Sequence, residues 1–299
     1  MTAVYSFIAE EKADSRSPWS VAEMCRVLQV SRSGFYDWEA PTASQRDVTD
    51  RLLAAEIEAI RECSARTYGA PRVHAWLRRQ GYRVARQRVA RIMRERGWSG
   101  QMGRVRVRTT RRDKHAAPAP DLVARAFDPD APDQLWAGDV TYLRTGQGWL
   151  YLATVIDLYS RRVIGWALAE HLRAELVCDA LGMAVATRGG RVEGVTFHSD
   201  RGCQYTSRQF RRLCARQRIT QSMGATAVCW DNSPPEAFFA TLKRELVHRF
   251  TWATRALMRR AVVRWIEGWY NARRLHSSIN YLSPIEKEAG YHDLSHRAA

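Results

Sequence analysis

The sequence lacks the cysteine and histidine spacings that mark disulfide frameworks and zinc sites. Its six cysteines lie far apart, and none belongs to a C-x-x-C pair. His74 and His115 have no cysteine or histidine partner at zinc-ligand spacing. We therefore expect reduced thiols and no structural zinc.

Long apolar runs are also missing. The longest largely apolar stretch, residues 149–156, is far too short to span a bilayer, which takes about 20 residues. The N-terminus has no basic segment followed by an apolar one, the pattern that directs secretion. We expect a cytoplasmic protein that contacts no membrane and is free to associate with the nucleoid.

Acidic residues are scarce relative to basic ones. The 299 residues hold 31 Asp and Glu against 47 Lys and Arg, a net charge of +16. Such an excess favours polyanions, because binding phosphates releases their counterions. A coding bias toward arginine would also raise the charge. Clustering argues against bias alone, since residues 82–114 hold twelve basic and two acidic side chains, a net charge of +10.

The first hundred residues show helical patterns. Ser20 and Glu23 match a capping box, and Ser31 is placed to cap a second short helix. This pair of helices predicts a helix-turn-helix-like region over residues 1–48.

A second helical, DNA-binding region is predicted over residues 49–101. Pro71 suits the first turn of a helix, and residues 84–96 form a further helix rich in arginine. Its outward side chains Arg86, Arg88 and Arg91 are candidate DNA contacts. The alternative is an ordinary helical bundle with a solvated arginine face.

Residues 102–132 lose periodicity and gain proline, so we expect a linker. This linker is basic, and we assign candidate DNA contacts to Arg104, Arg106 and Arg108.

Beyond residue 132 the apolar period changes from helical to strand-like. Three successive stretches predict a three-stranded antiparallel meander: 136–144, 149–157 and 162–169. Alternating helices and strands are expected after it: helices at 173–188, 207–217, 234–249 and 254–270, and strands at 193–199 and 219–223. The fold class is therefore α/β with a mixed sheet, with a sheet-containing core over 133–250 and a C-terminal helical extension over 251–299.

Three carboxylates occupy unusual positions in this plan. Asp139 interrupts an apolar strand, Asp200 ends another, and Glu236 opens a helix. A buried carboxylate needs a cation or a partner charge. Converging carboxylates from separate elements suit a pair of Mg²⁺ or Mn²⁺ ions, which activate an attacking hydroxyl and stabilise the leaving oxygen in phosphoryl transfer.

Each acid also has a plainer interpretation. Glu236 alone could simply complement the helix dipole. A fourth acid, Asp157, is expected to cap the following turn through Ser160, with a supporting role near the site left open.

The strings around the three acids resemble the catalytic motifs of bacterial insertion-sequence transposases related to retroviral integrases. They are Trp136-Ala-Gly-Asp139-Val-Thr-Tyr142, His198-Ser-Asp200-Arg-Gly-Cys-Gln-Tyr205-Thr-Ser207 and Asp231-Asn-Ser-Pro-Pro-Glu236-Ala-Phe-Phe-Ala-Thr-Leu-Lys243. Thirty-five residues separate Asp200 from Glu236, which matches the D,D(35)E spacing of that family. The strings Tyr68-Gly-Ala-Pro-Arg72 and Trp269-Tyr-Asn-Ala-Arg273-Arg-Leu-His276 resemble two further signatures, so the resemblance covers nearly the whole chain.

The resemblance implies a ribonuclease-H-like core that uses Mg²⁺ or Mn²⁺ to cleave transposon ends and to transfer the 3′-hydroxyl into target DNA. By the same resemblance Asp139, Asp200 and Glu236 are the metal ligands, and Lys243 contacts DNA near the scissile phosphate. An exposed helical lysine is the plainer interpretation of Lys243. Arg273 could contact the DNA backbone, as could His276, or both could close the C-terminal fold.

Two residues are expected to shape the site without holding metal. They are Asn232, which can cap the helix of Glu236, and His198, for which a satisfied core histidine is the favoured interpretation. The sequence departs from the family pattern at Cys203 and at Ala227, where serine and glycine are common.

The chain resembles the second reading frame of such elements, without the heptad-repeat helix that relatives carry upstream. An upstream-frame fusion partner is therefore expected, together with a homo-oligomer on DNA. Two alternatives stay open: a non-catalytic DNA-binding regulator of transposition and a stand-alone ribonuclease-H-like nuclease.

A basic linker that contacts phosphates predicts steeply salt-dependent DNA binding. Replacing the arginines of residues 104–112 with glutamine should flatten the slope of log K against log salt, by about one unit for each phosphate that the linker no longer binds. Fluorescence anisotropy of a labelled duplex at several salt concentrations measures this slope. An unchanged slope would remove the linker from the interface.

Overall fold

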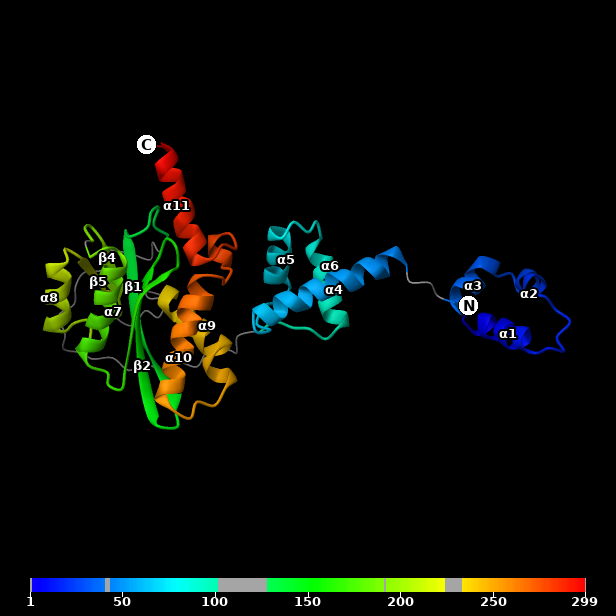
Figure 1. Cartoon of the computed structure of the whole chain (residues 1–299), viewed down its shortest axis with the longest axis horizontal. Helices are drawn as coiled ribbons and strands as arrows, with labels where there is room; N and C mark the ends of the chain where they lie inside the picture. The colour runs from blue at the N-terminus through cyan, green and yellow to red at the C-terminus, as the bar shows by residue number, and fades with distance from the viewer. Residues whose placement is uncertain (1, 41–43, 102–127, 191, 224–232, 299) are drawn as a thin grey trace.

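The computed structural model describes residues 2–40, 44–101, 128–190, 192–223 and 233–298 (Figure 1). The N-terminal helices are α1 (Thr2–Ala13), α2 (Val21–Val27), α3 (Arg32–Glu39), α4 (Gln45–Cys63), α5 (Ala70–Arg79) and α6 (Arg86–Glu95). The strands are β1 (Leu135–Thr145), β2 (Gly148–Asp157), β3 (Val163–Ala169), β4 (Thr196–Ser199) and β5 (Thr220–Met223). The remaining helices are α7 (Ala174–Thr187), α8 (Arg208–Arg216), α9 (Ser233–Glu245), α10 (Arg255–Arg264) and α11 (Pro284–Ala298).

The five strands form one mixed sheet in the order β3-β2-β1-β4-β5. The first three strands pair antiparallel in sequence order, and β4 and β5 run parallel to β1. The predicted meander and the alternation that follows it are confirmed. The α/β class with a mixed sheet is therefore correct.

Helices cover both faces of the sheet (Figure 1). On one face α7 and α8 pack against alternate strand residues such as Trp136 and Phe197. On the other face α9 and α10 pack against residues of opposite parity such as Ala137 and Leu143. The period-2 alternation of the strands therefore decides which side chains meet which helix layer.

The two helices that follow β5 differ from the single helices predicted over 234–249 and 254–270. The α9 helix ends at Glu245, and a short 3₁₀ turn, Val247–Arg249, follows it. The α10 helix continues beyond Arg264 as a π-helical segment, Trp265–Asn271. The Asn271 amide fixes this wider segment, because it bonds both the N–H and the carbonyl of Val163, at 3.0 and 2.9 Å.

The N-terminal helices form two small cores. Ile8, Met24 and Phe35 join α1, α2 and α3, and the predicted caps at Ser20 and Ser31 are both present. The helices α4, α5 and α6 share a separate apolar cluster. No helix in the described ranges combines the length and the apolar character needed to traverse a bilayer.

The α4–α6 unit is docked on the C-terminal segment of the chain. The Tyr68 hydroxyl accepts a hydrogen bond from the Leu275 N–H at 2.8 Å, and Arg72 donates to the Leu275 carbonyl at 3.1 Å. The Tyr68 ring lies 5.7 Å from that of Trp269, and Arg79 reaches the Tyr281 carbonyl at 3.2 Å. These contacts join residues about 200 positions apart, so they fix the helical unit against the catalytic sheet.

Next to this docking site lies a fully buried ion pair. Arg274 donates from Nε and from a terminal nitrogen to both oxygens of Glu245, at 2.8 to 3.1 Å, and each side chain is 3% exposed. Glu245 is the last residue of α9, whereas Arg274 precedes the docked Leu275. The pair therefore ties the α9 helix to the segment that holds the α4–α6 unit.

Removing one member of a buried pair leaves the other charged and unpartnered. We expect Arg274→Met to lower the free energy of unfolding by about 3–5 kcal/mol. Restoring neutrality with the double variant Glu245→Leu/Arg274→Met should recover most of that loss. Urea unfolding followed by circular dichroism measures both, and Arg273→Met, at an exposed neighbouring position, is the matched control. Equal effects of the two single variants would contradict the assignment.

Candidate active site

Asp139 lies in the middle of β1 on the face covered by α9. Ala137 packs in the same apolar cluster as the α9 side chains. Asp139 comes two residues later in the strand, so its side chain points to the same face. Its Oδ1 accepts a hydrogen bond from the Val140 N–H at 2.7 Å. Gly138 precedes it because a Cβ there would stand 2.3 Å from the buried Phe197 ring. The glycine lets β4 approach β1 closely at the level of the acid.

Asp200 follows directly after β4, the strand parallel to β1. Ala137 pairs with His198 in that ladder, so the same register carried two residues further sets Asp200 level with Asp139. Neighbouring strands lie about 4.8 Å apart, so the two acids come side by side on the adjacent strands β1 and β4, where β4 ends. The Asp200 residue as a whole is exposed, although the protein around its carboxyl group withdraws that group from water. Its Oδ1 accepts a hydrogen bond from the Gly202 N–H at 3.0 Å.

Glu236 occupies the first turn of α9 and is half-buried. The apolar face of that helix, with Phe238, Phe239 and Leu242, packs on the sheet and directs the helix across β1. The third acid therefore approaches the first two from a separate element.

The electrostatics link the three acids and one lysine. Burial, then the neighbouring Asp200 carboxylate and to a smaller degree Glu236, raises the pKa of Asp139 to about 8, and Lys243 opposes the rise. Burial also raises the pKa of Asp200. Burial lowers the pKa of Lys243, although Asp139 opposes that shift. The other three groups therefore lie within electrostatic range of Asp139, and ionising Asp139 beside the two other acids is unfavourable.

Within the described part of the chain, no three His, Cys, Asp or Glu side chains are gathered as a preformed metal site. Asp200 and Glu236 contribute to the raised pKa of Asp139, although the three acids form no closed ligand cage. Residues 224–232, which lead into Glu236, lie outside the described ranges.

One polar atom beside the acids is unsatisfied. Thr154 stands directly opposite Asp139 in the β1–β2 ladder, so both side chains point to the same face. Its Oγ1 is buried and has no hydrogen-bond partner among the described residues. A buried hydroxyl normally finds a partner, so this position favours a water or an ion nearby.

Sequence reasoning missed Tyr205 as part of this site. The side chain is buried against Phe197 and Phe210, with ring centroids 5.9 and 5.3 Å away. Burial, with the charges of Asp139 and Asp200 adding to it, raises the pKa of Tyr205 well above its usual range. An aromatic residue only five positions after Asp200 is the signal that could have found it.

The supporting residues have separate outcomes. His198 is buried, and its Nδ1 lies 3.0 Å from the Ser222 Oγ on β5, which agrees with a satisfied core histidine. Asn232 falls outside the described residues. Asp157 accepts hydrogen bonds from the Ser160 hydroxyl at 2.5 Å and the Ser160 N–H at 2.9 Å, so its predicted capping role is confirmed.

The candidate DNA contacts differ in their surroundings. Arg88 and Arg91 both pair with Asp50, and Arg91 also pairs with Glu95. Arg86 and Arg273 are exposed. The linker candidates Arg104, Arg106 and Arg108 lie outside the described residues.

His276 is buried in the C-terminal segment. Burial, followed by the nearby Arg274 and Arg72 charges, lowers its pKa to about 2. Of the two roles left open for this histidine, closing the C-terminal fold is the one that its burial supports.

Comparisons with known proteins agree with this geometry. Two integrase core domain families match residues 129–229 and 217–284, and a family of HTH-like domains matches residues 47–106. The transposase InsF for insertion sequence IS3A of Escherichia coli (strain K12) is 39% identical over 286 residues, covering 95% of this chain and 98% of that protein. A 31 kDa protein of insertion element IS600 from Shigella sonnei is 35% identical over 273 residues, covering 91% of this chain and 100% of that protein.

Among solved structures, the integrase catalytic core of HTLV-2 in complex with magnesium aligns with a TM-score of 0.41 at 15% identity. The alignment covers 53% of this chain and 98% of that one.

The mixed sheet, its helix layers and the matching domains define an integrase-core enzyme with a ribonuclease-H-like fold, preceded by helix-turn-helix-like helices. Enzymes of this class carry out nucleotidyl transfer on DNA. By identity over nearly its full length, the chain belongs to the InsF-type transposases of the IS3 family, and it is a DNA transposase.

The raised pKa of Asp139 predicts a pH-dependent stability in the absence of divalent metal. The folded protein holds a proton that the unfolded chain releases above about pH 4, so stability falls as pH rises from about 4 to 8. Asp139→Asn should remove this loss and stabilise the metal-free protein at pH 8.5 by a few kcal/mol, on the order expected for a shift of this size.

Urea unfolding in EDTA at pH 6 and pH 8.5 measures the difference, with Asp37→Asn on exposed α3 as the control. If Asp139→Asn and the control show the same pH dependence as the unsubstituted protein, the electrostatic assignment is wrong.

Proposed function

We propose that Asp139, Asp200 and Glu236 are the catalytic acids of this transposase and the ligands of two Mg²⁺ or Mn²⁺ ions. The observation that supports the proposal is the parallel β1–β4 register, because continuing it by two residues brings Asp139 and Asp200 level on adjacent strands. The pKa of Asp139 supports it, because both other acids contribute to its rise to about 8.

The residues present fit hard divalent cations. The donor set is carboxylate oxygen, the kind that Mg²⁺ prefers, and no cysteine or histidine belongs to it. The Thr154 Oγ1, buried without a partner among the described residues, supports an additional water or ion at the same edge. When bound, such ions supply the charge that lowers the pKa of an attacking hydroxyl and stabilises the leaving oxygen.

The chain's own residues orient the reacting groups. Asp139 and Asp200 point from the rigid sheet edge, whereas Glu236 closes the site from α9. Rigid elements hold reacting groups at productive distances, which is the main contribution that a protein makes to phosphoryl transfer. In cleavage, water attacks a phosphodiester at the transposon end and breaks it into a transposon 3′-hydroxyl and a 5′-phosphate on the flanking strand. In strand transfer, that 3′-hydroxyl attacks a target phosphodiester, forms the new bond to its phosphorus and displaces a target 3′-hydroxyl as the leaving group.

Lys243 is proposed to contact the DNA phosphate beside the scissile bond. It lies seven residues after Glu236 on α9, so both side chains project from one face of the helix. Its amine is half-buried and within electrostatic range of Asp139. A phosphate bound there would meet a positive charge close to the acids.

The remaining contacts are proposed for DNA held away from the reacting centre. Arg86 and Arg273 are exposed and available to phosphates, and the linker residues Arg104, Arg106 and Arg108 extend the basic surface. Arg88 and Arg91 would exchange their ion pairs with Asp50 for phosphates.

We also propose the division of the chain that the sequence predicts. The helix-turn-helix-like region covers 1–48, the second helical region 49–101, the linker 102–132, the core 133–250 and the extension 251–299. Assembly as a homo-oligomer on DNA and fusion to an upstream-frame partner complete the proposal.

The proposal predicts that each acid is indispensable. Asp139→Asn, Asp200→Asn and Glu236→Gln should each reduce 3′-end joining with Mg²⁺ by on the order of a thousandfold, because each removes a charge that the transition state requires. Joining of a labelled transposon-end duplex to plasmid DNA measures the loss.

Binding of the same duplex should persist in all three variants, which separates catalysis from binding. Asp157→Asn, which alters a structural cap rather than the site, is the control for a general effect of removing a buried acid. Full joining activity in any one of the three variants would remove that residue from the catalytic set.

A further inference from the structure

The outer face of α8 carries an unusual concentration of positive charge. Four of its nine residues are exposed arginines: Arg208, Arg211, Arg212 and Arg216. Its opposite face holds Phe210 and Cys214, which are buried against the sheet. None of the four arginine side chains forms a hydrogen bond or ion pair with another residue in the described ranges. Packing therefore explains one face of α8 and leaves the arginine face without a structural role.

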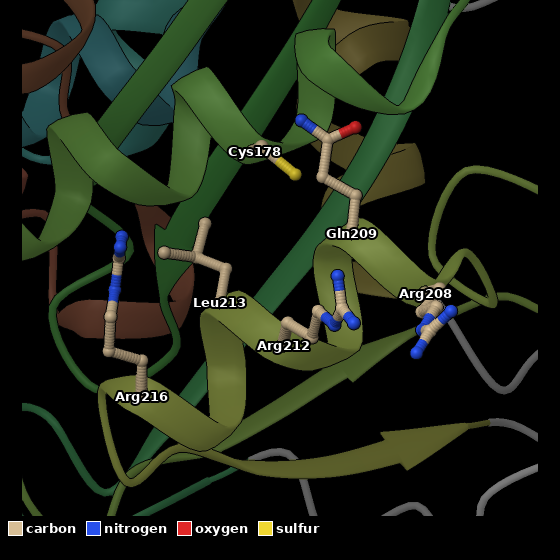
Figure 2. A pocket seen from close by; sticks show the side chains of 6 residues that line it. All are labelled: Cys178, Arg208, Gln209, Arg212, Leu213 and Arg216. Atoms are coloured by element: carbon tan, nitrogen blue, oxygen red, sulfur yellow. The ribbon is translucent and has the colours of Figure 1, made fainter.

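Three of these arginines form a row along a shallow groove between α7 and α8. Figure 2 shows Arg208, Arg212 and Arg216 following one another along α8, with Cys178 of α7 opposite them. Gln209 and Leu213 complete the lining. Small-molecule pockets are enclosed and mainly apolar, whereas this groove is open and lined by guanidinium groups. Its chemistry suits a polyanion.

The row has the spacing of a nucleic-acid backbone. Residues at i, i+4 and i+8 of a helix are separated by about 6 Å per step. Each strand of duplex DNA rises about 3.4 Å per nucleotide, so one helical step corresponds to about two phosphates. Guanidinium groups also bind phosphate oxygens in a bidentate manner. The row therefore fits three phosphates along one strand.

Two acids lie on the α7 side of the groove. Glu175 and Asp179 contribute to the pKa of Cys178, which burial raises to about 11. Neither acid forms an ion pair with the α8 arginines. The contrast is with α6, where Asp50 pairs with Arg88 and Arg91. The α8 row thus keeps its charge available, whereas part of the α6 charge is neutralised within the protein.

The position of α8 identifies which DNA it meets. The α8 helix belongs to the sheet face opposite α9 and α10, whereas the α4–α6 unit docks beside the α9 end through Leu275 (Figure 1). Its first residue, Arg208, comes eight positions after Asp200, so a short loop connects that acid to the start of the row. Strand transfer requires two DNA molecules at one site. We expect the α4–α6 unit to bind one DNA molecule and the α8 face of the core to bind the other.

We propose that the α8 row binds the phosphate backbone of target DNA on the side of the core away from the helix-turn-helix-like unit. This inference rests on the proposed strand-transfer function and adds the surface that receives the target.

The test uses the full-length triple variant Arg208→Gln/Arg212→Gln/Arg216→Gln in strand transfer from a labelled transposon-end duplex into supercoiled plasmid. The plasmid concentration for half-maximal joining should rise about tenfold. Removing three phosphate contacts should also make the salt slope of plasmid binding shallower by about 3. Binding of the end duplex should stay within about twofold of the unsubstituted protein. The conservative triple lysine variant should retain the salt slope, because it keeps the charge.

The matched control is Arg144→Gln/Arg260→Gln/Arg264→Gln, which removes the same charge from exposed positions on β1 and α10. If both triple variants show the same plasmid dependence, the α8 row is not a DNA surface. A loss confined to end-duplex binding would assign the row to the transposon end and overturn the target assignment. If the unsubstituted protein joins no ends, the proposed function fails instead, and the salt slope of plasmid binding then decides the inference alone. Circular dichroism melting checks that both variants fold.

Discussion

The buried pair between Glu245 and Arg274 is the contact on which the arrangement of the whole molecule depends. Glu245 ends the helix whose first turn carries the proposed catalytic Glu236, and Arg274 precedes Leu275, which hydrogen-bonds Tyr68 of the helical unit. Two desolvated charges in a dry interior are stable only with nearly complete mutual hydrogen bonding, which this pair has. Such a pair tolerates little displacement, so it sets the positions of the catalytic helix and the docking segment together.

The proposed catalytic edge follows the opposite principle. Burial and the two neighbouring acids raise the pKa of Asp139, and Lys243 offsets only part of that rise. Strand register and the close approach allowed by Gly138 hold the groups there, whereas the folding energy comes from apolar packing on both sheet faces. A bound cation, alone or together with a phosphate, would therefore stabilise the ionised acids strongly. Because apolar packing supplies the folding energy, the core stays stable although the three acids lie in an electrostatically unfavourable arrangement.

Much of this structure could be predicted from local pattern. The meander, the Ser20 cap and the Asp157–Ser160 turn each depend on residues close together in sequence, so periodicity and spacing were sufficient. The three acids were found because carboxylates in apolar strands need an explanation. The spacing from Asp200 to Glu236 then matched a known motif.

What could not be predicted depends on distant contacts. The π-helical segment follows from Asn271 bonding Val163 on a strand about a hundred residues earlier, and no local signal marks it. The docking of Tyr68 on Leu275 has the same character. Tyr205 was missed because its importance lies in which charges surround it in space. Arginine-rich stretches looked alike in sequence, although acids neutralise part of α6 and leave α8 uncompensated.

The docking of the helical unit on the tail of the chain has an evolutionary consequence. Because the C-terminal segment sets the orientation of that unit, the covalent connection through residues 102–127 need only be long enough to join them. The length of that stretch can then change without altering how a bound DNA end meets the proposed catalytic acids. Truncating the protein after α9 would have the reverse effect. It would keep all three proposed catalytic acids but remove the C-terminal segment that holds the α4–α6 unit in a fixed orientation relative to them.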